Sequence, residues 1–309
     1  MGAVLKHGVC GGAARLILRR ILTNVCLSRT IELHKEAPAG GRGREMMAKQ
    51  KERAADPAAE EIYAKGRAYY QAQDFARAAA CFLQAAQKGH PDAENCLGCC
   101  YEAGQGVVRD FVRAADHYRR AAWRGNAYAQ YNLGNCYAEG RGVARDDKAA
   151  FEWFRLSAEN GYAPAQRRAA LALLYGIGVE RNASAAVGWL EKAAQQGDIS
   201  ARCDLGSCYY FGAGVEKNRK RAFRCFREAA LKGSIEAMNN VGYCFRFGQG
   251  IMRNEKKAFG CFRTAARRGY AGAQHNLGRC YLEGCGVARD EEQARLWLER
   301  AAQNGYRGG

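Results

Sequence analysis

Fourteen cysteines and five histidines are the residues of this 309-residue chain whose side chains could do chemistry. Thiolates and imidazoles serve as nucleophiles, as general bases and as ligands for zinc. Cys96, Cys99 and Cys100 share one side of a predicted helix and could offer two or three thiolates to a metal ion. Structural zinc takes four ligands, and no second Cys-x-x-Cys follows nearby. We therefore expect no metal site and no cofactor.

Five cysteines recur at one position of a repeating pattern, so the repeat accounts for their spacing before any site does. They are Cys100, Cys136, Cys208, Cys244 and Cys280. Thiols one repeat apart would lie roughly 10 Å apart, whereas a disulfide needs Cα atoms closer than about 7 Å. We interpret them as small buried packing groups. Because no convincing secretory signal precedes the repeats, we expect reduced thiols in a cytoplasmic protein.

None of the histidines lies in a recognisable catalytic motif, in which a base would be held by an orienting partner. His117 occupies a position that holds Trp153, Trp189 and Trp297 in other repeats, so we expect it to pack. His275 is expected on a face that could bind a ligand. Repeated glycine pairs resemble phosphate loops only superficially, since no Gly-Lys-Ser/Thr occurs. The chain is predicted not to be an enzyme.

The elements that must position these residues follow a period of 36 residues. Seven times an Ala-Ala pair, or a near copy, is followed three residues later by a glycine. A period of this size is typical of a solenoid, in which each unit packs on its neighbours and has no core of its own. The glycines are Gly89, Gly125, Gly161, Gly197, Gly233, Gly269 and Gly305.

Each unit contains the signals of two helices. Ala93, Leu97 and Tyr101, with their equivalents, recur at i, i+4 and i+8 and mark one face of a first helix. Glycine within a helix costs about 1 kcal/mol relative to alanine, so the glycine after each leucine indicates a close approach by a second helix. A glycine pair such as Gly104 and Gly106 ends the first helix. The second begins at an N-cap residue: Asp110, Asp146, Asn182, Asn218, Asn254 or Asp290.

The combined pattern, A-x-x-x-L-G-x-x-Y-x-x-G-x-G-V-x-x-[DN]-x-x-x-A…A-A-x-x-G, resembles the Sel-one-like repeat, a relative of the tetratricopeptide repeat. It covers 216 of the 309 residues. The resemblance implies a right-handed α-solenoid superhelix of antiparallel helix pairs, used as an adaptor or scaffold, with the first helices lining a concave face. A preceding unit lacks the four-residue glycine insertion and is more similar to a tetratricopeptide repeat; it shares Gly66, Tyr69, Asp74, Ala78, Phe82, Ala85 and Gly89 with the other columns.

These observations divide the chain into four parts. Residues 1–58 are expected to form a disordered basic region, residues 59–90 the degenerate unit, residues 91–306 six Sel-one-like repeats, and residues 307–309 a tail. Leu18, Ile21, Leu22 and Val25 could alternatively share the face of a targeting helix, or precede a true start at Met46 or Met47. No stretch reaches the roughly 18 apolar residues that would span a membrane.

Some positions vary between repeats while their neighbours stay constant, and we interpret these as free for binding. Their Asn, Tyr and Arg side chains suit a peptide ligand. The sequence therefore predicts a non-enzymatic protein-interaction scaffold that binds a peptide or a helix in the concave groove. The predicted partner-binding residues are Asn95, Tyr131, Asn135, Arg167, Leu171, Leu174, Tyr210, Asn239, Tyr243, Arg246, His275 and Arg279.

The repeat 163–198 departs from the pattern. Ala169 and Ala170 replace the Leu-Gly pair, and Leu173 replaces the tyrosine. One interpretation is an apolar patch of Leu171 and Leu174 midway along the groove. The other is that this repeat has drifted and repacked.

Charge leaves an alternative function open. The net charge of +17, from 48 basic and 31 acidic residues, favours acidic partners, anionic surfaces or nucleic acid. One column is basic in every repeat, and it is either a ridge for such a partner or a solvated edge with salt bridges. The column consists of Arg109, Arg145, Arg181, Lys217, Arg253 and Arg289.

Two further expectations concern the ends of the pattern and the thiols. The last repeat has no capping helix, so apolar groups near Trp297 could support self-association. A secreted, cysteine-rich branch of the resembling family has disulfides within its repeats and a hydrolase activity. The column of its second cysteine holds alanine here, from Ala86 to Ala302, so neither property carries over.

Overall fold

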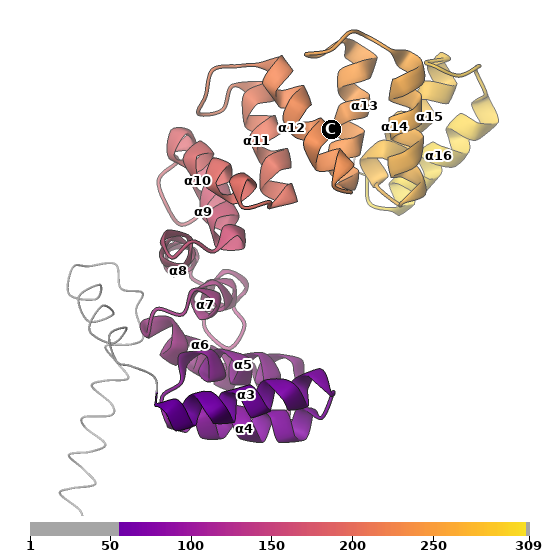
Figure 1. Cartoon of the computed structure of the whole chain (residues 1–309). Coiled ribbons are helices and arrows are strands. Elements are labelled where there is room, and N and C mark those ends of the chain that lie inside the picture. The colour runs from indigo at the N-terminus through magenta and orange to yellow at the C-terminus, as the bar shows by residue number, and fades with distance from the viewer. Residues whose placement is uncertain (1–55, 307–309) are drawn as a thin grey trace, which may run out of the picture. The chain divides into compact units, whose positions relative to one another are not determined.

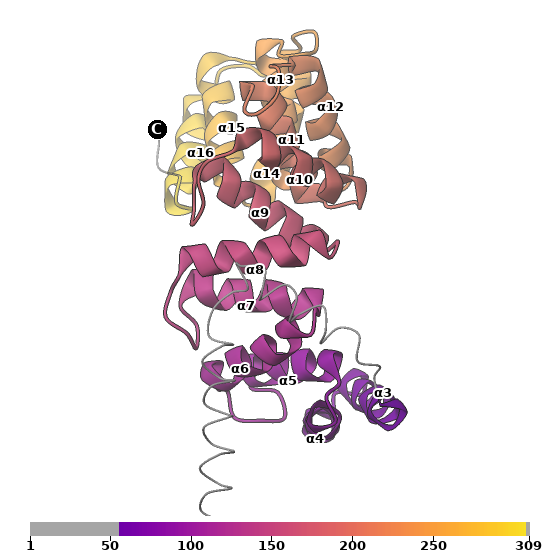
Figure 2. The same cartoon turned by 90° about the vertical axis from the view of Figure 1, so that its left-hand side faces the viewer.

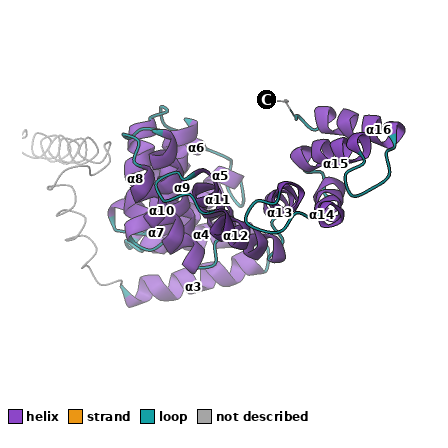
Figure 3. Ribbon diagram, turned by 90° about the horizontal axis from the view of Figure 1, so that it is seen from above, coloured by secondary structure: helices purple, strands orange, loops and turns teal. Residues whose placement is uncertain are grey.

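A computed structural model describes residues 56–306 of the chain. Within this range it contains fourteen α-helices and no strand (Figure 3). The expectations for residues 1–55 and for the tail lie outside the described residues. The chain forms two compact units, Met1–Ala129 and Gln130–Gly309, which are treated separately below. None of the fourteen helices is both long and apolar enough to cross a bilayer.

The helices alternate between first and second members of seven pairs (Figure 1). The first helices are α3 (Pro57–Gln71), α5 (Pro91–Ala103), α7 (Ala127–Glu139), α9 (Ala163–Tyr175), α11 (Ile199–Phe211), α13 (Ile235–Phe247) and α15 (Ala271–Glu283). The second helices are α4 (Phe75–Gln87), α6 (Phe111–Trp123), α8 (Asp147–Glu159), α10 (Ala183–Gln195), α12 (Arg219–Leu231), α14 (Glu255–Arg267) and α16 (Glu291–Gln303).

The second helices begin where the sequence predicts. The Asp110 carboxylate accepts hydrogen bonds from the backbone N–H groups of Val112 and Arg113, both at 3.0 Å. Asn254 caps α14 in the same way through the N–H of Lys257, at 2.9 Å. Each cap of this kind stabilises its helix by about 1 kcal/mol. All six predicted N-cap residues from Asp110 to Asp290 accept such a bond.

The glycine pair has one role within its repeat and another between repeats. Gly248 ends α13 with φ +65°, a conformation that favours glycine. A β-carbon on Gly250 would collide with the carbonyl group of Arg219, the first residue of α12 in the preceding repeat. The turn of this repeat can therefore lie directly against the start of the preceding second helix. The same close approach occurs at Gly106, Gly178, Gly214 and Gly286.

The glycine within five of the first helices accommodates a ring from the partner helix. A β-carbon on Gly242 would lie 2.7 Å from the Phe262 ring of α14, which is fully buried. Gly98 has the same relation to Tyr118, at 2.6 Å. The predicted close approach of the second helix is therefore confirmed. Its occupant is an aromatic side chain at these glycines and Leu298 opposite Gly278 in the last repeat.

Neighbouring pairs share one layered core within each unit. In residues 130–306, α12 packs on both α11 and α13, and α14 on both α13 and α15. Figures 1 and 2 both show this alternation. The predicted thiol column is part of the core, since Cys208, Cys244 and Cys280 are all buried. The fold is an all-α repeat solenoid, as the sequence predicts.

Candidate functional site

The first helices of residues 130–306 are connected to one another directly. Side-chain bonds between residues 37 apart cross from each of these helices to the next. They join Arg167 to Asp204, Asn240 to Cys203, Asn276 to Asn239, and Arg246 to Glu283. Helices α9, α11, α13 and α15 therefore share one surface, which we call the first-helix face.

Four aromatic rings gather on this face at the C-terminal ends of α11 and α13. Tyr210 contacts Phe211 at 4.9 Å and Tyr243 at 6.3 Å between ring centroids, and Tyr243 contacts Phe247 at 4.5 Å. These separations are those of favourable aromatic pairs. Phe211 is nevertheless 74% exposed, Phe247 48% and Tyr243 41%. We call these four residues the aromatic cluster.

The position of the cluster follows from the helix ends. Phe211 and Phe247 immediately precede the glycines that end α11 and α13, and both side chains are exposed. Tyr175 holds the same position in α9 and is 73% exposed. Sequence analysis missed these three residues. The sequence could have indicated them, because this column holds an aromatic residue in three consecutive repeats.

Arginines border the aromatic cluster. The Arg219 guanidinium lies 4.8 Å from the centroid of the Tyr210 ring, and the Arg246 guanidinium lies 5.1 Å from that of Phe247. Such cation–π contacts fix the orientation of the ring and of the cation together. Arg219 also donates a hydrogen bond of 3.4 Å to the Tyr210 hydroxyl.

One carboxylate serves two of the arginines at this end of the face. Glu283 forms ion pairs with Arg246 and with Arg279, the latter at 2.6 Å. Burial works to raise the pKa of Glu283, but the two guanidinium groups hold it below its ordinary value. The carboxylate is therefore ionised at neutral pH. Two positive charges share one negative charge, which leaves this end of the face cationic.

Two titratable groups next to the arginines are neutral at neutral pH. Burial, with the charges of Arg279 and Arg246, lowers the pKa of His275. Burial and the nearby Tyr210 raise the pKa of Tyr243, so its phenol keeps its proton and can donate a hydrogen bond. The site therefore presents rings, hydroxyls and guanidinium groups.

One predicted binding column packs against the residue that ends its own repeat. The Tyr131 ring meets that of Tyr162 edge to face at 5.2 Å, and the His275 ring stacks on Tyr306 at 4.3 Å. In both cases the partner lies 31 residues later, at the last position of the same repeat, 127–162 or 271–306. Variation in this column can therefore reflect the changing identity of its neighbour.

Other predicted residues on the first-helix face are engaged with neighbouring repeats. Arg167 donates to Asp204 at 2.6 Å, and Asn239 accepts from Asn276 at 2.9 Å. Arg246 is only 7% exposed. The structure thus brings Tyr210, Tyr243, Arg246, Arg279 and His275 together at one end of the face.

The remaining predicted residues do not join the aromatic cluster. Leu171 and Leu174 are half-buried on α9. Asn135 is half-buried on α7, and its Oδ1 atom accepts no hydrogen bond within the described residues. Asn95 lies on α5, in the other compact unit.

The cysteines of α5 are protonated and packed against neighbouring side chains. Burial raises the pKa of Cys96 to about 11 and that of Cys100 to about 12, so both stay protonated at neutral pH. Cys99 accepts a hydrogen bond from the Tyr118 hydroxyl at 3.5 Å. Within residues 56–306 no cluster of His, Cys, Asp and Glu could hold a metal ion.

His117 packs as the tryptophans in its column predict. Its ring stacks on Tyr101 with 5.5 Å between centroids, and its Nδ1 atom lies 2.6 Å from a carboxylate oxygen of Glu94. The side chains of both hydrogen-bonded residues are largely buried. This pair joins the two helices of one repeat, α5 and α6.

The basic column is partly neutralised by neighbouring acids. Arg145 forms two bonds of 3.1 Å with Asp147, and Arg253 pairs with Glu255. Both acids lie two residues after the arginine, at the start of a second helix. Arg109 instead lies over the Phe111 ring at 5.4 Å. Three of the six basic residues in this column therefore have local partners. This agrees with the interpretation of the column as a solvated edge with salt bridges.

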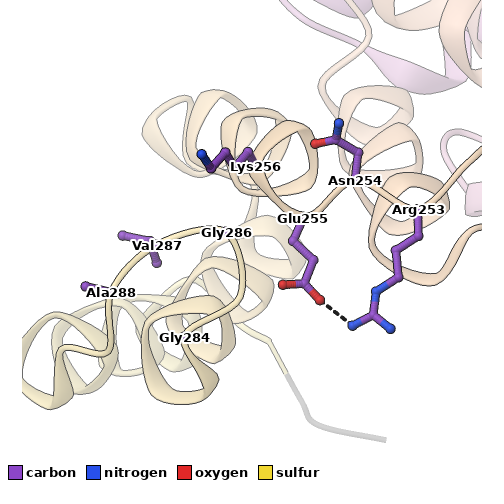
Figure 4. Close-up of a pocket in the computed structure, with 8 residues that line it drawn as sticks. All are labelled: Arg253, Asn254, Glu255, Lys256, Gly284, Gly286, Val287 and Ala288. Atoms are coloured by element: carbon purple, nitrogen blue, oxygen red, sulfur yellow. Dashed lines mark hydrogen bonds and ion pairs between the residues drawn. The ribbon is translucent and has the colours of Figure 1, made fainter.

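A pocket of about 740 Å³ lies beside Arg253 (Figure 4). Its walls are the start of α14, including Lys256, and the glycine turn between α15 and the next helix. Figure 4 shows the Arg253–Glu255 ion pair on one side and the backbone of Gly284 and Gly286 on the other. The pocket is therefore a by-product of the contact between successive turns.

Tandem helix pairs with an exposed face of first helices define a repeat scaffold. The model of the Sel1 repeat family matches seven consecutive stretches: 58–90, 91–126, 127–162, 163–198, 199–234, 235–270 and 271–306. The chain belongs to the Sel1 repeat family, and the resemblance drawn from its sequence is confirmed. Proteins of this family are generally protein-interaction scaffolds. The first stretch is the unit without the glycine insertion.

Two solved structures are similar over most of this chain. A Sel1 repeat protein from Oxalobacter formigenes is 31% identical with a TM-score of 0.74, covering 80% of this chain and 99% of its own. The protective antigen c5321 of uropathogenic Escherichia coli, which has an SLR fold, is 32% identical with a TM-score of 0.72. That match covers 84% of this chain and 56% of the antigen. Comparison with curated proteins gave no significant match.

Proposed function

We propose that this chain is a non-enzymatic scaffold that binds a segment of a partner protein on its first-helix face. The observation that carries the proposal is the aromatic cluster, in which three large rings stay exposed on one surface. Exposed apolar patches bordered by polar groups are typical of interaction sites. Tyrosine and arginine are also the residue types that most often dominate binding energy.

Within this proposal the predicted binding residues have unequal weight. Tyr210, Tyr243 and Arg279 lie in or beside the cluster and are assigned direct contact with the partner. Arg246 is buried beneath Phe247 and is assigned to positioning that ring. The other predicted residues stay predictions, as do the cytoplasmic location, self-association through the last repeat and an acidic partner along the basic column.

The test is affinity capture from a native lysate at two salt concentrations, with partners quantified by mass spectrometry. The variant Tyr243→Ala with Phe247→Ala removes two exposed rings of the cluster. The matched control is Leu231→Ala with Met252→Ala, which removes two exposed apolar side chains elsewhere in the same unit. We expect the first variant to capture at least tenfold less of a specific partner protein than the unaltered chain does. The control should capture as much of that protein as the unaltered chain.

Melting temperatures complete the design, because a variant that unfolds would lose partners for a trivial reason. Equal losses from both variants, or a melting temperature lowered only in the first, would contradict the proposal. Nucleic acid captured at low salt and lost with Arg145→Glu and Arg181→Glu would assign binding to the basic column instead.

A further inference from the structure

We infer that the bound segment is extended and acidic, with apolar side chains three residues apart. This inference rests on the proposed function and names the ligand chemistry of the same face. It depends on three features: a row of rings, the hydrogen-bonding groups beside it, and the charge around it.

The row consists of Tyr175, Phe211 and Phe247, one ring from each of three consecutive repeats. Each is the last residue of its helix, α9, α11 or α13, so the rings occupy equivalent positions 36 residues apart. The bonds from Arg167 to Asp204 and from Asn240 to Cys203 show that these helices are direct neighbours. From the usual spacing of neighbouring helix axes, roughly 8–10 Å, we infer that the rings recur at about this interval along the face.

An extended chain matches this spacing with every third residue. A β-strand rises about 3.3 Å per residue and a polyproline II helix about 3.1 Å, so three residues span roughly 9–10 Å in either form. An α-helix rises about 1.5 Å per residue and would match the row only once in six or seven residues. A segment of seven extended residues is long enough to reach all three rings.

The polar groups beside the row favour an extended ligand over a helical one. An extended segment leaves its backbone N–H and C=O groups in need of partners, whereas those of a helix are paired internally. The phenol of Tyr243 keeps its proton and is 41% exposed, so it can donate to a carbonyl group. Arg279 is half-exposed and has further N–H donors beyond those that it gives to Glu283.

Charge selects an acidic segment. Arg219 and Arg246 lie against rings of the aromatic cluster, and Arg279 lies one repeat further along the face. Glu283 is the carboxylate that pairs with two of these three arginines. Carboxylates placed between the apolar residues of the segment would find guanidinium donors on the rim of the row. A basic segment would be repelled there.

The experiment is selection from a random library of phage-displayed 12-residue peptides on the immobilised full chain. Peptides retained by the variant Phe211→Ala with Phe247→Ala are subtracted. We expect the enriched peptides to carry aromatic, Leu or Pro residues at i, i+3 and i+6, with an excess of Asp and Glu between them. A synthetic copy should bind at least tenfold more weakly to the ring variant and to Arg219→Glu with Arg279→Glu. Leu231→Ala with Met252→Ala should bind within twofold of the unaltered chain.

The outcomes separate this inference from the proposed function. Enriched peptides that need the two phenylalanines but carry apolar residues at i, i+4 or i+7 would overturn the extended ligand and leave the binding face in place. Enriched peptides that are neutral or basic would overturn the acidic ligand alone. If no peptide survives the subtraction, both the inference and the proposed function fail.

Discussion

The repeats 163–198 and 235–270 fill the same space between their two helices in different ways. In 235–270, Gly242 leaves room for the buried Phe262 ring. In 163–198 the corresponding residues are Ala170 and Leu190, both fully buried. The repeat that gained a methyl group on one helix thus has a smaller side chain on the other. Among the described repeats, a ring is found only opposite glycine, whereas the leucine of this column occurs with Ala170 here and opposite Gly278 in the repeat 271–306. Core packing is sensitive to such volumes, so the ring is the side chain that needs the glycine.

This comparison bears on the two interpretations of the unusual repeat. Ala170 and Leu190 hold the positions of the glycine and the ring, and Ala169, Ala170 and Leu190 are all fully buried. A smaller side chain in the position of the ring, together with the added methyl group, is what drift with repacking predicts. An apolar patch for binding would have to rest on the half-buried Leu171 and Leu174 alone.

The largest expected effect comes from placing the alanine of one repeat into the other. Gly242→Ala puts a β-carbon 2.7 Å from a ring that cannot move into solvent, and overpacking of this kind costs about 1–3 kcal/mol. Adding Phe262→Leu reproduces the pair of the repeat 163–198 and should recover part of the loss. Urea unfolding of the single and double variants measures this coupling.

Native-state hydrogen exchange supplies the control for that prediction. Protection should fall most in α13 and α14 and least in α9 and α10, because the effect is local to one repeat. Additive single and double variants, with no recovery from Phe262→Leu, would show that the two positions are not a matched pair.

Part of this comparison could be predicted from the sequence and part could not. The glycine of each Leu-Gly pair indicates a close approach because its cost within a helix needs a reason. That Phe262 fills the space opposite Gly242 depends on the relative rotation of the two helices, which the period does not give. Likewise, the variation of Tyr131 predicted binding, whereas its packing role depends on Tyr162, the last residue of the same repeat, lying beside its ring.

The next effect is smaller and tests the other half of the comparison. Ala170→Gly should destabilise the repeat 163–198 by about 1 kcal/mol, because glycine is the poorer helix former. The double variant with Leu190→Phe recreates the glycine and ring of the other repeat and should lie closer to the unaltered chain. Thermal unfolding of the two single variants and the double variant gives their order of stability. Leu190→Phe alone should be the least stable, since a ring would then meet the alanine methyl.

The same two repeats differ in a buried thiol, which gives a dependence on pH. Cys244 occupies the position that Ala172 holds in 163–198, and burial raises the pKa of its thiol to about 11, with Arg219 opposing the shift. The folded state thus binds this proton more tightly than the unfolded state. The stabilisation is complete below the ordinary pKa of 9.0 and is lost as the pH rises from there toward 11.

Cys244→Ala isolates this contribution from those of other groups that titrate in alkali. The free energy of unfolding should fall less steeply between pH 9 and 11 in the variant than in the unaltered chain. Ala172→Cys offers the converse change and should make the fall steeper. If the free energy of unfolding falls with pH at the same rate in all three proteins, the thiol has the same pKa in the folded and unfolded states.

The smallest expected effect on stability concerns the rings at the helix ends. Phe247 and Tyr175 hold the same position in the two repeats and are both exposed, so truncation of either leaves no cavity in the core. Substitutions at such surface positions usually change stability by less than about 0.5 kcal/mol. Phe247 also contacts the Tyr243 ring and the Arg246 guanidinium, whereas no such ring contact involves Tyr175 among those found in residues 130–306. Phe247→Ala should therefore cost slightly more than Tyr175→Ala, while both stay near this limit. A loss of several kcal/mol at either position would mean that the ring supports the fold, and its exposure would then no longer indicate a binding surface.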